Sequence, residues 1–339
     1  MTTNEKLGQA ERAAGPATTM RAMVQNIYGS ADVLRLAQID RPVPAAGEVL
    51  VQVVAAGLDR GTWHLMTGTP YLMRLVCGLR GPRNPVLGRD VAGTVVAVGS
   101  EVTRFVIGDE VYGMGSGSFA EYVVVREAKI AHKPANLTFE QAAAVPISAG
   151  TALQALDAGH IQPGQRVLIT GASGGVGSFA VQLAKGLGAE VTGVCSTGKV
   201  DLVRSLGADH VVDYTLTDFS TGGQRYDLII DIAGNSPLSR LRRVLTATGT
   251  LVIVGAENAG KLTGMSRQLR APVVSLFVSQ RLTSLVSREH SGVLVRLTQL
   301  IESGTVVPSI DRIYPLAEVP AAMRHLAAGN VLGKVAISI

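Results

Sequence analysis

Short apolar runs that end near a glycine or a charged residue follow one another through the first third of this chain. Between Met20 and Val125 they read RAMVQNIYG, EVLVQVVAAG, DVAGTVVAVGSEV, DEVYG and GSFAEYVVV. Alternating or β-branched apolar positions predict strands, and several short strands with glycine turns are typical of a compact β-rich domain built as a partly closed barrel. Pro42 and Pro44 fall between the first two runs and predict a loop there.

Beyond Lys133 the pattern changes to strands that alternate with helices. The segment LTFEQAAAVPISAGTALQAL predicts a helix, a break at Pro146 and a second helix, and we place the hinge into a second domain here. Apolar runs then follow at VLI, EVTGVC, HVVDY, YDLIIDIAG and GTLVIVG, with helical stretches between most of them. Repeated β-α-β units predict a doubly wound parallel sheet, so the fold class is α/β, with a ligand at the carboxyl ends of the strands. The residues at those ends are Thr170, Ser196, Tyr214, Ala233, Gly234 and Gly255.

Two stretches fit neither pattern. Residues 58–85 form a long irregular segment, which predicts either a binding loop or a surface excursion with a helical turn. Residues 265–303 look helical and apolar; they predict either a lid or interface beside the ligand cleft or the last core helices, and we favour core helices. A helix through Ala321 and Leu326 then precedes GKVAISI, a strand that we expect to return to the first domain.

The segment VLITGASGGVGSFAVQLAK, residues 167–185, predicts a buried strand, a glycine-rich turn and a helix in that order. Aligned on G-x-G-x-x-G, the three positions are Ala172, Gly174 and Gly177, with alanine in place of the first glycine. Backbone N–H groups at such a helix start can approach a pyrophosphate closely, whereas the alternative is a turn with no ligand. We expect the cofactor to contact Ala172, Ser173, Gly174, Gly175, Val176 and Gly177.

The composition limits the class of protein. A length of 339 residues predicts two domains at roughly 150 residues each. No apolar run reaches the ~18 residues that a membrane helix needs. Residues 1–19 have no apolar core, so we expect a disordered leader before a fold that begins near Met20. The only two cysteines, Cys77 and Cys195, lie far apart and indicate a reducing compartment, predicted to be the cytoplasm, and small buried side chains.

The charge pattern bears on the partners. The net charge is +5, but lysine and arginine are scattered, without a dense basic tract or aromatic interleaving. This distribution argues against nucleic acid as a partner and is compatible with a phosphorylated small molecule.

Four blocks of the sequence carry a family resemblance. They are PVLGRDVAG at 85–93 with GDEV at 108–111, AVPISAGTA at 144–152, GASGGVG at 171–177 and GKV at 333–335. With these the chain resembles the medium-chain dehydrogenase/reductase superfamily, in its zinc-free quinone oxidoreductase branch and the subgroup of the reticulon-4-interacting protein. The resemblance implies a GroES-like catalytic domain at 20–145 and 307–339, a Rossmann cofactor domain at 146–306, a nicotinamide in the cleft between them, and a homodimer.

This chain differs from the zinc-dependent members of the superfamily at the positions of the zinc ligands. Where those members have a cysteine and a Gly-His-Glu block, this chain has Asp59 and then Gly88, Arg89 and Asp90, and the structural cysteine cluster is absent. Neither zinc site can be assembled from these residues, so alcohol oxidation loses its Lewis acid. A hydride can still be delivered to an activated electrophile such as a quinone or an enone. We therefore predict no metal.

The residues expected beside the substrate are Asp59, Trp63 and Tyr71. Zinc-free relatives usually have asparagine at the first of these positions and often aspartate where this chain has Thr62. Asp59 is either a proton relay or a cap for the turn RGTW, and we favour the cap. Trp63 and Tyr71 have an alternative interpretation as local core.

The second strand of the doubly wound sheet ends Val-Cys-Ser-Thr-Gly-Lys, without the carboxylate that would hold the ribose 2′-OH of NAD. Ser196 and Lys199 suit a 2′-phosphate instead, so we predict NADPH; the alternative is a solvated Lys199 without selectivity. The resemblance adds Tyr214 as a phosphate contact and brings further residues towards the nicotinamide. These are Thr151, which is otherwise a helix-start hydroxyl, Ala233, Val254, Gly255 and Lys334.

The prediction is therefore an NADPH-dependent, zinc-independent oxidoreductase that reduces quinones or α,β-unsaturated carbonyls, with a small-molecule substrate as its partner. Two alternatives stay open at this point. One is a non-catalytic NADPH-binding sensor, because the sequence shows no indispensable acid or base. The other is an alcohol dehydrogenase-like enzyme, which would need bound metal.

Overall fold

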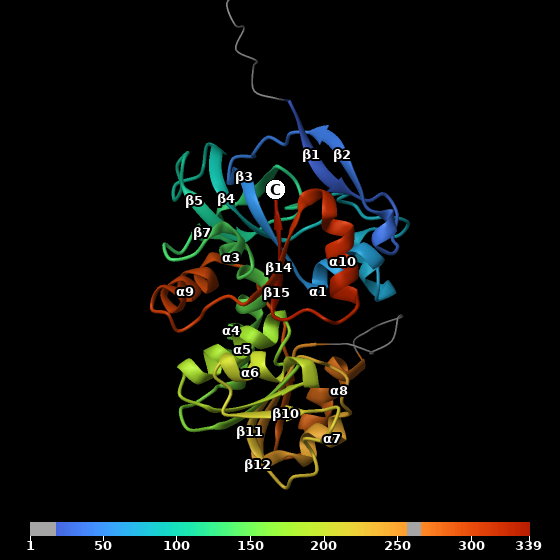
Figure 1. Ribbon diagram of the computed structural model, residues 1–339, viewed down its shortest axis with the longest axis vertical. Coiled ribbons are helices and arrows are strands. Elements are labelled where there is room, and N and C mark those ends of the chain that lie inside the picture. The colour runs from blue at the N-terminus through green and yellow to red at the C-terminus, as the bar shows by residue number, and fades with distance from the viewer. Residues whose placement is uncertain (1–17, 256–265) are drawn as a thin grey trace, which may run out of the picture.

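Two β-sheets organise the molecule, one in each half. The computed structural model describes residues 18–255 and 266–339. In Figure 1 a seven-stranded, largely antiparallel sheet lies in the upper half and a six-stranded parallel sheet in the lower half. The predictions for the leader before residue 18 and for residues 256–265 lie outside the described residues.

The upper sheet contains the strands that the sequence pattern predicts between Glu48 and Val125 and at the C-terminus. Its order is β14-β15-β3-β4-β5-β7, with β6 added beside β3. The last strand of the chain pairs antiparallel with β3, Val335 opposite Leu58, so the expected return of the C-terminus is confirmed. The bounds are β3 Glu48–Leu58, β4 Asp90–Val98, β5 Glu110–Met114, β6 Tyr122–Arg126, β7 Ile130–His132, β14 Ile310–Pro315 and β15 Lys334–Ser338.

A separate hairpin of β1 (Thr19–Val24) and β2 (Arg35–Asp40) lies at the top of Figure 1. The sequence pattern missed β2, because four of its six side chains are exposed and the strand therefore lacks a regular alternation of apolar and polar residues. It also missed β7, which has only three residues. A strand is marked by apolar periodicity only where one face is buried.

The lower sheet is entirely parallel, in the order β10-β9-β8-β11-β12-β13. This is the doubly wound arrangement, and the chain changes direction along the sheet between β8 and β11. Leu168 and Ile169 of β8 are fully buried on opposite faces, as expected for a central strand. The bounds are β8 Arg166–Thr170, β9 Glu190–Cys195, β10 His210–Asp213, β11 Tyr226–Asp231, β12 Leu245–Ile253 and β13 Arg281–Ser284.

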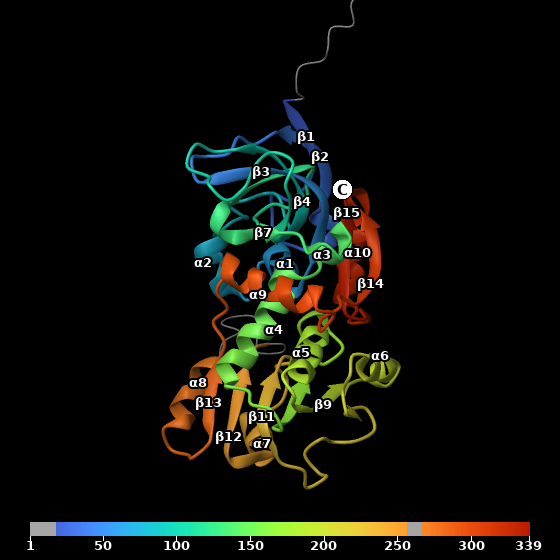
Figure 2. The ribbon, with the colours of Figure 1, turned by 90° about the vertical axis from the view of Figure 1, so that its left-hand side faces the viewer.

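Helices cover both faces of the parallel sheet. On one face α4 (Pro146–Gly159), α5 (Gly175–Gly186) and α9 (Ser291–Glu302) pack around Ile169. On the other face α7 (Leu238–Arg243) and α8 (Ser266–Ser275) pack around Leu168, while α6 (Val200–Ser205) follows β9. Helix α4 runs between the two halves, so that it joins them (Figure 2). The break predicted at Pro146 separates it from α3 (Phe139–Ala143).

One prediction for this half was wrong. Residues 281–284 form β13 at the sheet edge, where the pattern predicted helix, because a four-residue strand with alternating polar side chains carries no periodic signal. The prediction of core helices holds for α9, whose Val293, Leu294, Leu297 and Ile301 are buried. It does not hold for α8, in which only Ala271 is buried.

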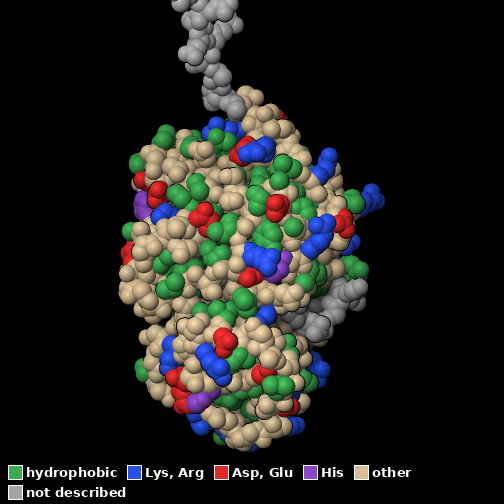
Figure 3. Space-filling view, viewed as in Figure 1, with side chains coloured by type: hydrophobic (Ala, Val, Ile, Leu, Met, Phe, Trp, Pro, Cys, Tyr) green, Lys and Arg blue, Asp and Glu red, His purple; other side chains and the backbone are tan. Residues whose placement is uncertain are grey.

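The segment between β3 and β4 is helical rather than irregular. It contains α1 (Arg60–Thr67) and α2 (Arg74–Cys77), and α1 packs near α10 (Val319–Ala327). Lys, Arg, Asp and Glu side chains are interspersed over the face seen in Figure 3, without one continuous basic stripe. Within the described residues, no helix is long and apolar enough to cross a membrane.

Candidate active site

The glycine-rich turn connects β8 to α5 at the carboxyl edge of the parallel sheet. A methyl group at Gly177 would lie 2.1 Å from the carbonyl oxygen of Gly171, so only glycine lets the helix approach the strand this closely. At Gly174 the nearest atom that a methyl group would meet is 3.5 Å away, so this glycine leaves open space above the helix start. Helix α5 has no side-chain cap and no acidic residue in its first turn. Free N–H groups beside open space fit a pyrophosphate.

Ala172 explains why the first glycine of the motif is dispensable. Its side chain is fully buried in the core beneath the turn, so its methyl group does not point at the ligand space. The side chain of Thr170 is hydrogen-bonded to other protein groups. Its hydroxyl donates to Oδ1 of buried Asp231 at 2.7 Å and accepts the N–H of Ala233. Arg267 of α8 reaches Oδ2 of the same aspartate at 2.5 Å.

A cavity of about 430 Å³ lies next to the turn, at the ends of β8, β9 and β11. Its lining brings together six of the predicted residues: Ser173, Gly174, Ser196, Lys199, Tyr214 and Ala233. The described lining contains two cations, Lys199 and Arg240, and no carboxylate. Sequence reasoning missed Arg240, whose guanidinium lies 4.6 Å from the ring centre of Phe219 and is paired with Asp218. A cavity with this charge fits the adenosine end of a phosphorylated dinucleotide.

Lys199 joins the two halves of the molecule. Its ammonium donates to the carbonyl oxygens of Gly329 at 2.6 Å and Val331 at 3.0 Å, which precede β15. Burial lowers the pKa of Lys199, and Asp311 acts in the opposite direction. Lys199 lines both this cavity and the next one.

The second cavity, of about 850 Å³, fills the cleft between the halves. It is lined by the predicted residues Asp59, Thr151, Gly174, Gly175, Val176, Ala233, Val254, Gly255 and Lys334. Much of the remaining lining is apolar and includes Leu58, Leu72, Val76, Ile147 and Leu285. The two cavities meet at Gly174 and Lys199, so an extended ligand can occupy both.

Two of the residues expected beside the substrate do not line this cleft. Trp63 packs against the apolar cluster around α10, with Arg60 4.6 Å from its ring centre. Tyr71 is almost half exposed and lies under Arg74, 4.8 Å from the ring centre. Trp63 is instead held by the apolar cluster and Arg60, and Tyr71 is held by Arg74. The local-core alternative therefore describes Trp63 better.

Asp59 caps α1. Its Oδ1 accepts the N–H of Thr62 at 2.8 Å and its Oδ2 accepts the hydroxyl of the same residue at 3.3 Å. The favoured interpretation as a cap is confirmed.

A buried ion pair supports the floor of the cleft. The ammonium of Lys334 donates to the carbonyl oxygen of Leu58 at 3.0 Å, to Oγ of Ser148 at 3.0 Å and to Oδ2 of Asp90 at 3.3 Å. Asp90 is 0% exposed and Lys334 is 1% exposed. Burial raises the pKa of Asp90 to about 6, the charge of Lys334 opposes this, and Asp59 adds to it. A methyl group at Gly175 would lie 3.0 Å from Cδ of Lys334, so this side chain lies directly beneath the start of α5.

Arg89 crosses the cleft to the other half of the molecule. Its guanidinium pairs with Glu289, whose second oxygen accepts from Nζ of Lys129 at 2.7 Å. A methyl group at Gly61 would lie 2.8 Å from Oδ1 of Asp59 and 3.0 Å from Nη1 of Arg89. Glycine at this position therefore keeps the space between these two charges open to the cleft.

Comparisons with known proteins agree with this architecture. The family model described as "Alcohol dehydrogenase GroES-like domain" matches residues 45–135, and "Zinc-binding dehydrogenase" matches residues 206–337. The "2-methylene-furan-3-one reductase" of Solanum lycopersicum is 34% identical over 94% of this chain and 79% of its own. The "NAD(P)H oxidoreductase RTN4IP1, mitochondrial" of Mus musculus is 35% identical over 95% of this chain and 90% of its own. The chain belongs to the medium-chain dehydrogenase/reductase superfamily.

A solved structure of this superfamily extends the match over the whole fold. The quinone oxidoreductase from Coxiella burnetii superposes with a TM-score of 0.85 at 28% identity, covering 95% of this chain and 99% of that one. The side chains expected at the metal positions of zinc-dependent relatives, Asp59, Arg89 and Asp90, each have a protein partner. Across residues 18–255 and 266–339, no group of three or more His, Cys, Asp or Glu side chains is placed to hold a metal.

Proposed function

We propose that this protein is an NADPH-dependent, zinc-independent reductase of quinones or α,β-unsaturated carbonyls. The observation that carries the proposal is the pair of joined cavities, one lined by cations at the strand ends and one apolar, which meet at an uncapped helix start. Relatives named as a quinone oxidoreductase and as an NADPH-dependent alkenal/one oxidoreductase support the substrate class.

The residues that would hold the cofactor follow from their places. The first turn of α5 with Gly174 would bind the pyrophosphate, and Ser196, Lys199, Tyr214 and Arg240 would bind the adenosine phosphate. Thr151, Ala233, Val254 and Gly255 would line the nicotinamide. Bound NADPH supplies the hydride.

At the substrate end, Ile147, Val254 and Leu285 exclude water from the reacting carbons. Arg89 places positive charge in the cleft, where it would stabilise the negative charge that develops on a carbonyl oxygen. Because Asp59 is committed to Thr62, we assign the protonation of that oxygen to water at the mouth of the cleft rather than to a side chain.

The test is a steady-state assay of the purified protein with a panel of quinones and enones, followed by NADPH absorbance. We expect turnover with at least one member of the panel and a higher kcat/KM with NADPH than with NADH. Tight NADPH binding without turnover of any member would contradict the proposal and favour a non-catalytic sensor. Metal analysis of the active protein separates it from an alcohol dehydrogenase-like enzyme, which would need stoichiometric zinc.

Three further expectations are kept as part of the proposal. The proposed domain limits are 20–145 with 307–339 for the catalytic domain and 146–306 for the cofactor domain. A homodimer is supported by the edge position of β13 and by the exposed apolar side chains of α8, and light scattering tests it. A reducing compartment such as the cytoplasm is supported by two unpaired cysteines.

A further inference from the structure

The segment around α2 exposes an unusual number of apolar side chains. Leu72, Leu75, Val76 and Leu79 are 46%, 61%, 73% and 68% exposed. Leu75 and Val76 lie in α2, Leu72 lies in the 3₁₀ turn before it, and Leu79 follows Gly78, where the helix has ended. We call these four residues the apolar rim. Contiguous exposed apolar patches commonly mark an interaction site.

The rim continues the wall of the substrate cleft. Leu72 and Val76 belong to the rim and also line the 850 Å³ cavity, together with Pro70 and Met73. Leu72 and Val76 therefore give a molecule in the cleft an apolar path towards the surface. Such a path fits a substrate with a long hydrocarbon tail.

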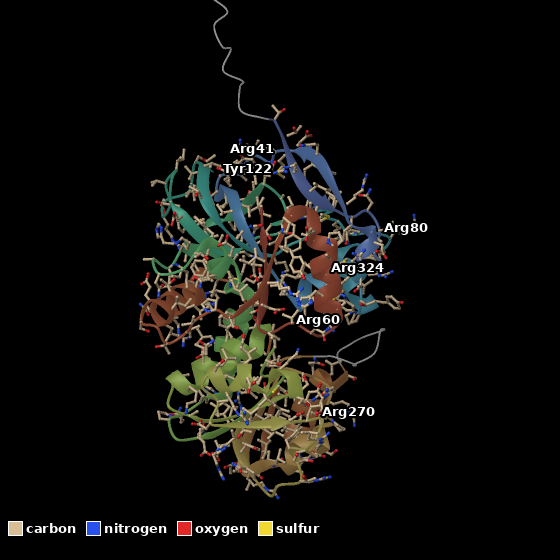
Figure 4. All side chains as sticks on the ribbon, viewed as in Figure 1. Arg41, Arg60, Arg80, Tyr122, Arg270 and Arg324 are labelled. Carbon is tan, nitrogen blue, oxygen red and sulfur yellow. The ribbon has the colours of Figure 1, made fainter. Side chains whose placement is uncertain are left out.

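The charge around the rim has one sign. Residues 60–89 contain five arginines and neither Asp nor Glu. Arg80 and Arg83 are exposed, and Figure 4 shows Arg80 projecting from the edge of the upper half. Exposed apolar side chains beside exposed arginines complement a bilayer interface that carries anionic phosphates.

The segment is held firmly enough to present this surface. Arg74 donates from Nε to the carbonyl oxygen of Gly68 at 2.8 Å and lies over the rings of Tyr28 and Tyr71. The hydroxyl of Tyr28 donates to the carbonyl oxygen of Gly78 at 2.7 Å. These contacts anchor the polar side of the segment to the protein, so the apolar rim is left facing solvent.

We propose that the apolar rim, with Arg80 and Arg83, docks on the surface of an anionic phospholipid bilayer, from which the cleft takes a quinone or enone with a long hydrocarbon tail. The docking part stands on this surface alone, whereas the substrate part rests on the proposed reductase function.

Vesicle flotation tests the docking. The wild-type protein should float with phosphatidylglycerol vesicles and much less with phosphatidylcholine vesicles. A Leu75→Asp/Leu79→Asp variant and an Arg80→Gln/Arg83→Gln variant should each bind anionic vesicles about tenfold more weakly or worse. The matched control is Val106→Asp/Ile107→Asp, on another loop with 65% and 66% exposure, and it should bind like the wild type. Thermal melts confirm that every variant is folded.

Kinetics test the substrate part. The rim variants should lower kcat/KM about tenfold for a long-tailed quinone supplied in vesicles, and should leave a short water-soluble quinone unchanged. A wild-type protein that ignores anionic vesicles overturns the docking, and so does a control variant that loses binding equally. If light scattering shows that Leu75→Asp/Leu79→Asp changes the subunit number, the rim is a protein interface and the proposal is wrong. If the wild type reduces neither quinone, the reductase function fails while the flotation result still decides the docking.

Discussion

Replacing Lys334 with methionine removes the only lysine from a cluster that has almost no contact with solvent. The ammonium is lost from three acceptors, Leu58, Ser148 and Asp90, while the alkyl chain beneath Gly175 is largely kept. The carboxylate of Asp90 is then left fully buried with one hydrogen bond from the N–H of Ile147 at 2.8 Å.

The size of the effect depends on pH. The rise in the pKa of Asp90 from 3.8 to about 6 means that this group's contribution to wild-type stability is complete below pH 3.8 and is lost as the pH rises through about 6. That loss is roughly 3 kcal/mol. Lys334 lowers this pKa, so its removal moves the pKa higher and extends the loss to higher pH. Above pH 6 the variant should therefore fall behind the wild type by up to about 1.4 kcal/mol per pH unit.

Urea unfolding between pH 5 and pH 8 measures this difference. We expect Lys334→Met to cost roughly 1–2 kcal/mol at the low end and about 3–5 kcal/mol at the high end. Adding Asp90→Asn to Lys334→Met should remove the pH dependence of the loss in unfolding free energy. The control is Lys185→Met, which breaks a lysine–aspartate pair of 2.8 Å that is about one-third exposed and should cost less than about 1 kcal/mol at every pH. A deficit that stays constant with pH, or that persists unchanged in the double variant, would refute the reasoning.

The remaining predictions concern the cofactor turn and the cleft. Lys199→Ala should lower kcat/KM for NADPH roughly tenfold or more and leave NADH nearly unchanged; equal values for the two cofactors in the wild type would contradict the assignment. Gly177→Ala should lower the melting temperature, because its methyl group meets a carbonyl oxygen at 2.1 Å, whereas Gly174→Ala should melt normally and weaken NADPH binding in a fluorescence titration. Arg89→Met should reduce kcat by about tenfold to a hundredfold, while Glu289→Gln keeps the guanidinium and should retain most of the rate; equal losses would make the ion pair, not the charge, the important feature.

The sequence was sufficient for the elements that are buried or forced by glycine. Leu168 and Ile169 form an apolar run that only a strand covered on both faces explains, and the spacing of Gly174 and Gly177 follows from a helix packed against that strand. The strands β2, β7 and β13 escaped prediction because they are short or exposed, and their pairing with a neighbour supplies what their own sequences lack.

The residues that line the first cavity were easier to predict than those of the cleft for a related reason. Ser196 and Tyr214 are identified by their places at strand ends, which the topology of a doubly wound sheet fixes. Arg240 reaches the same cavity from the short helix α7, and Arg89 meets Glu289 across 200 positions of sequence. Trp63 was placed beside the substrate because it lies in the irregular segment 58–85, whereas its contacts depend on how α1 packs against α10.

The contacts of Lys199 allow it both to bind a phosphate, as proposed, and to hold the loop before β15. An ammonium has three N–H donors, and in the described part of the chain two of them are used by the carbonyl oxygens of Gly329 and Val331. One donor is left for a phosphate oxygen, so Lys199 can bind the cofactor without releasing the loop that leads into β15. That loop ends at Lys334, which lies beneath the start of α5. The first cavity and the floor of the cleft are therefore tied to the same few residues before and within β15, and under the proposed assignment a cofactor phosphate on Lys199 would also hold this loop in the position that supports the glycine-rich turn.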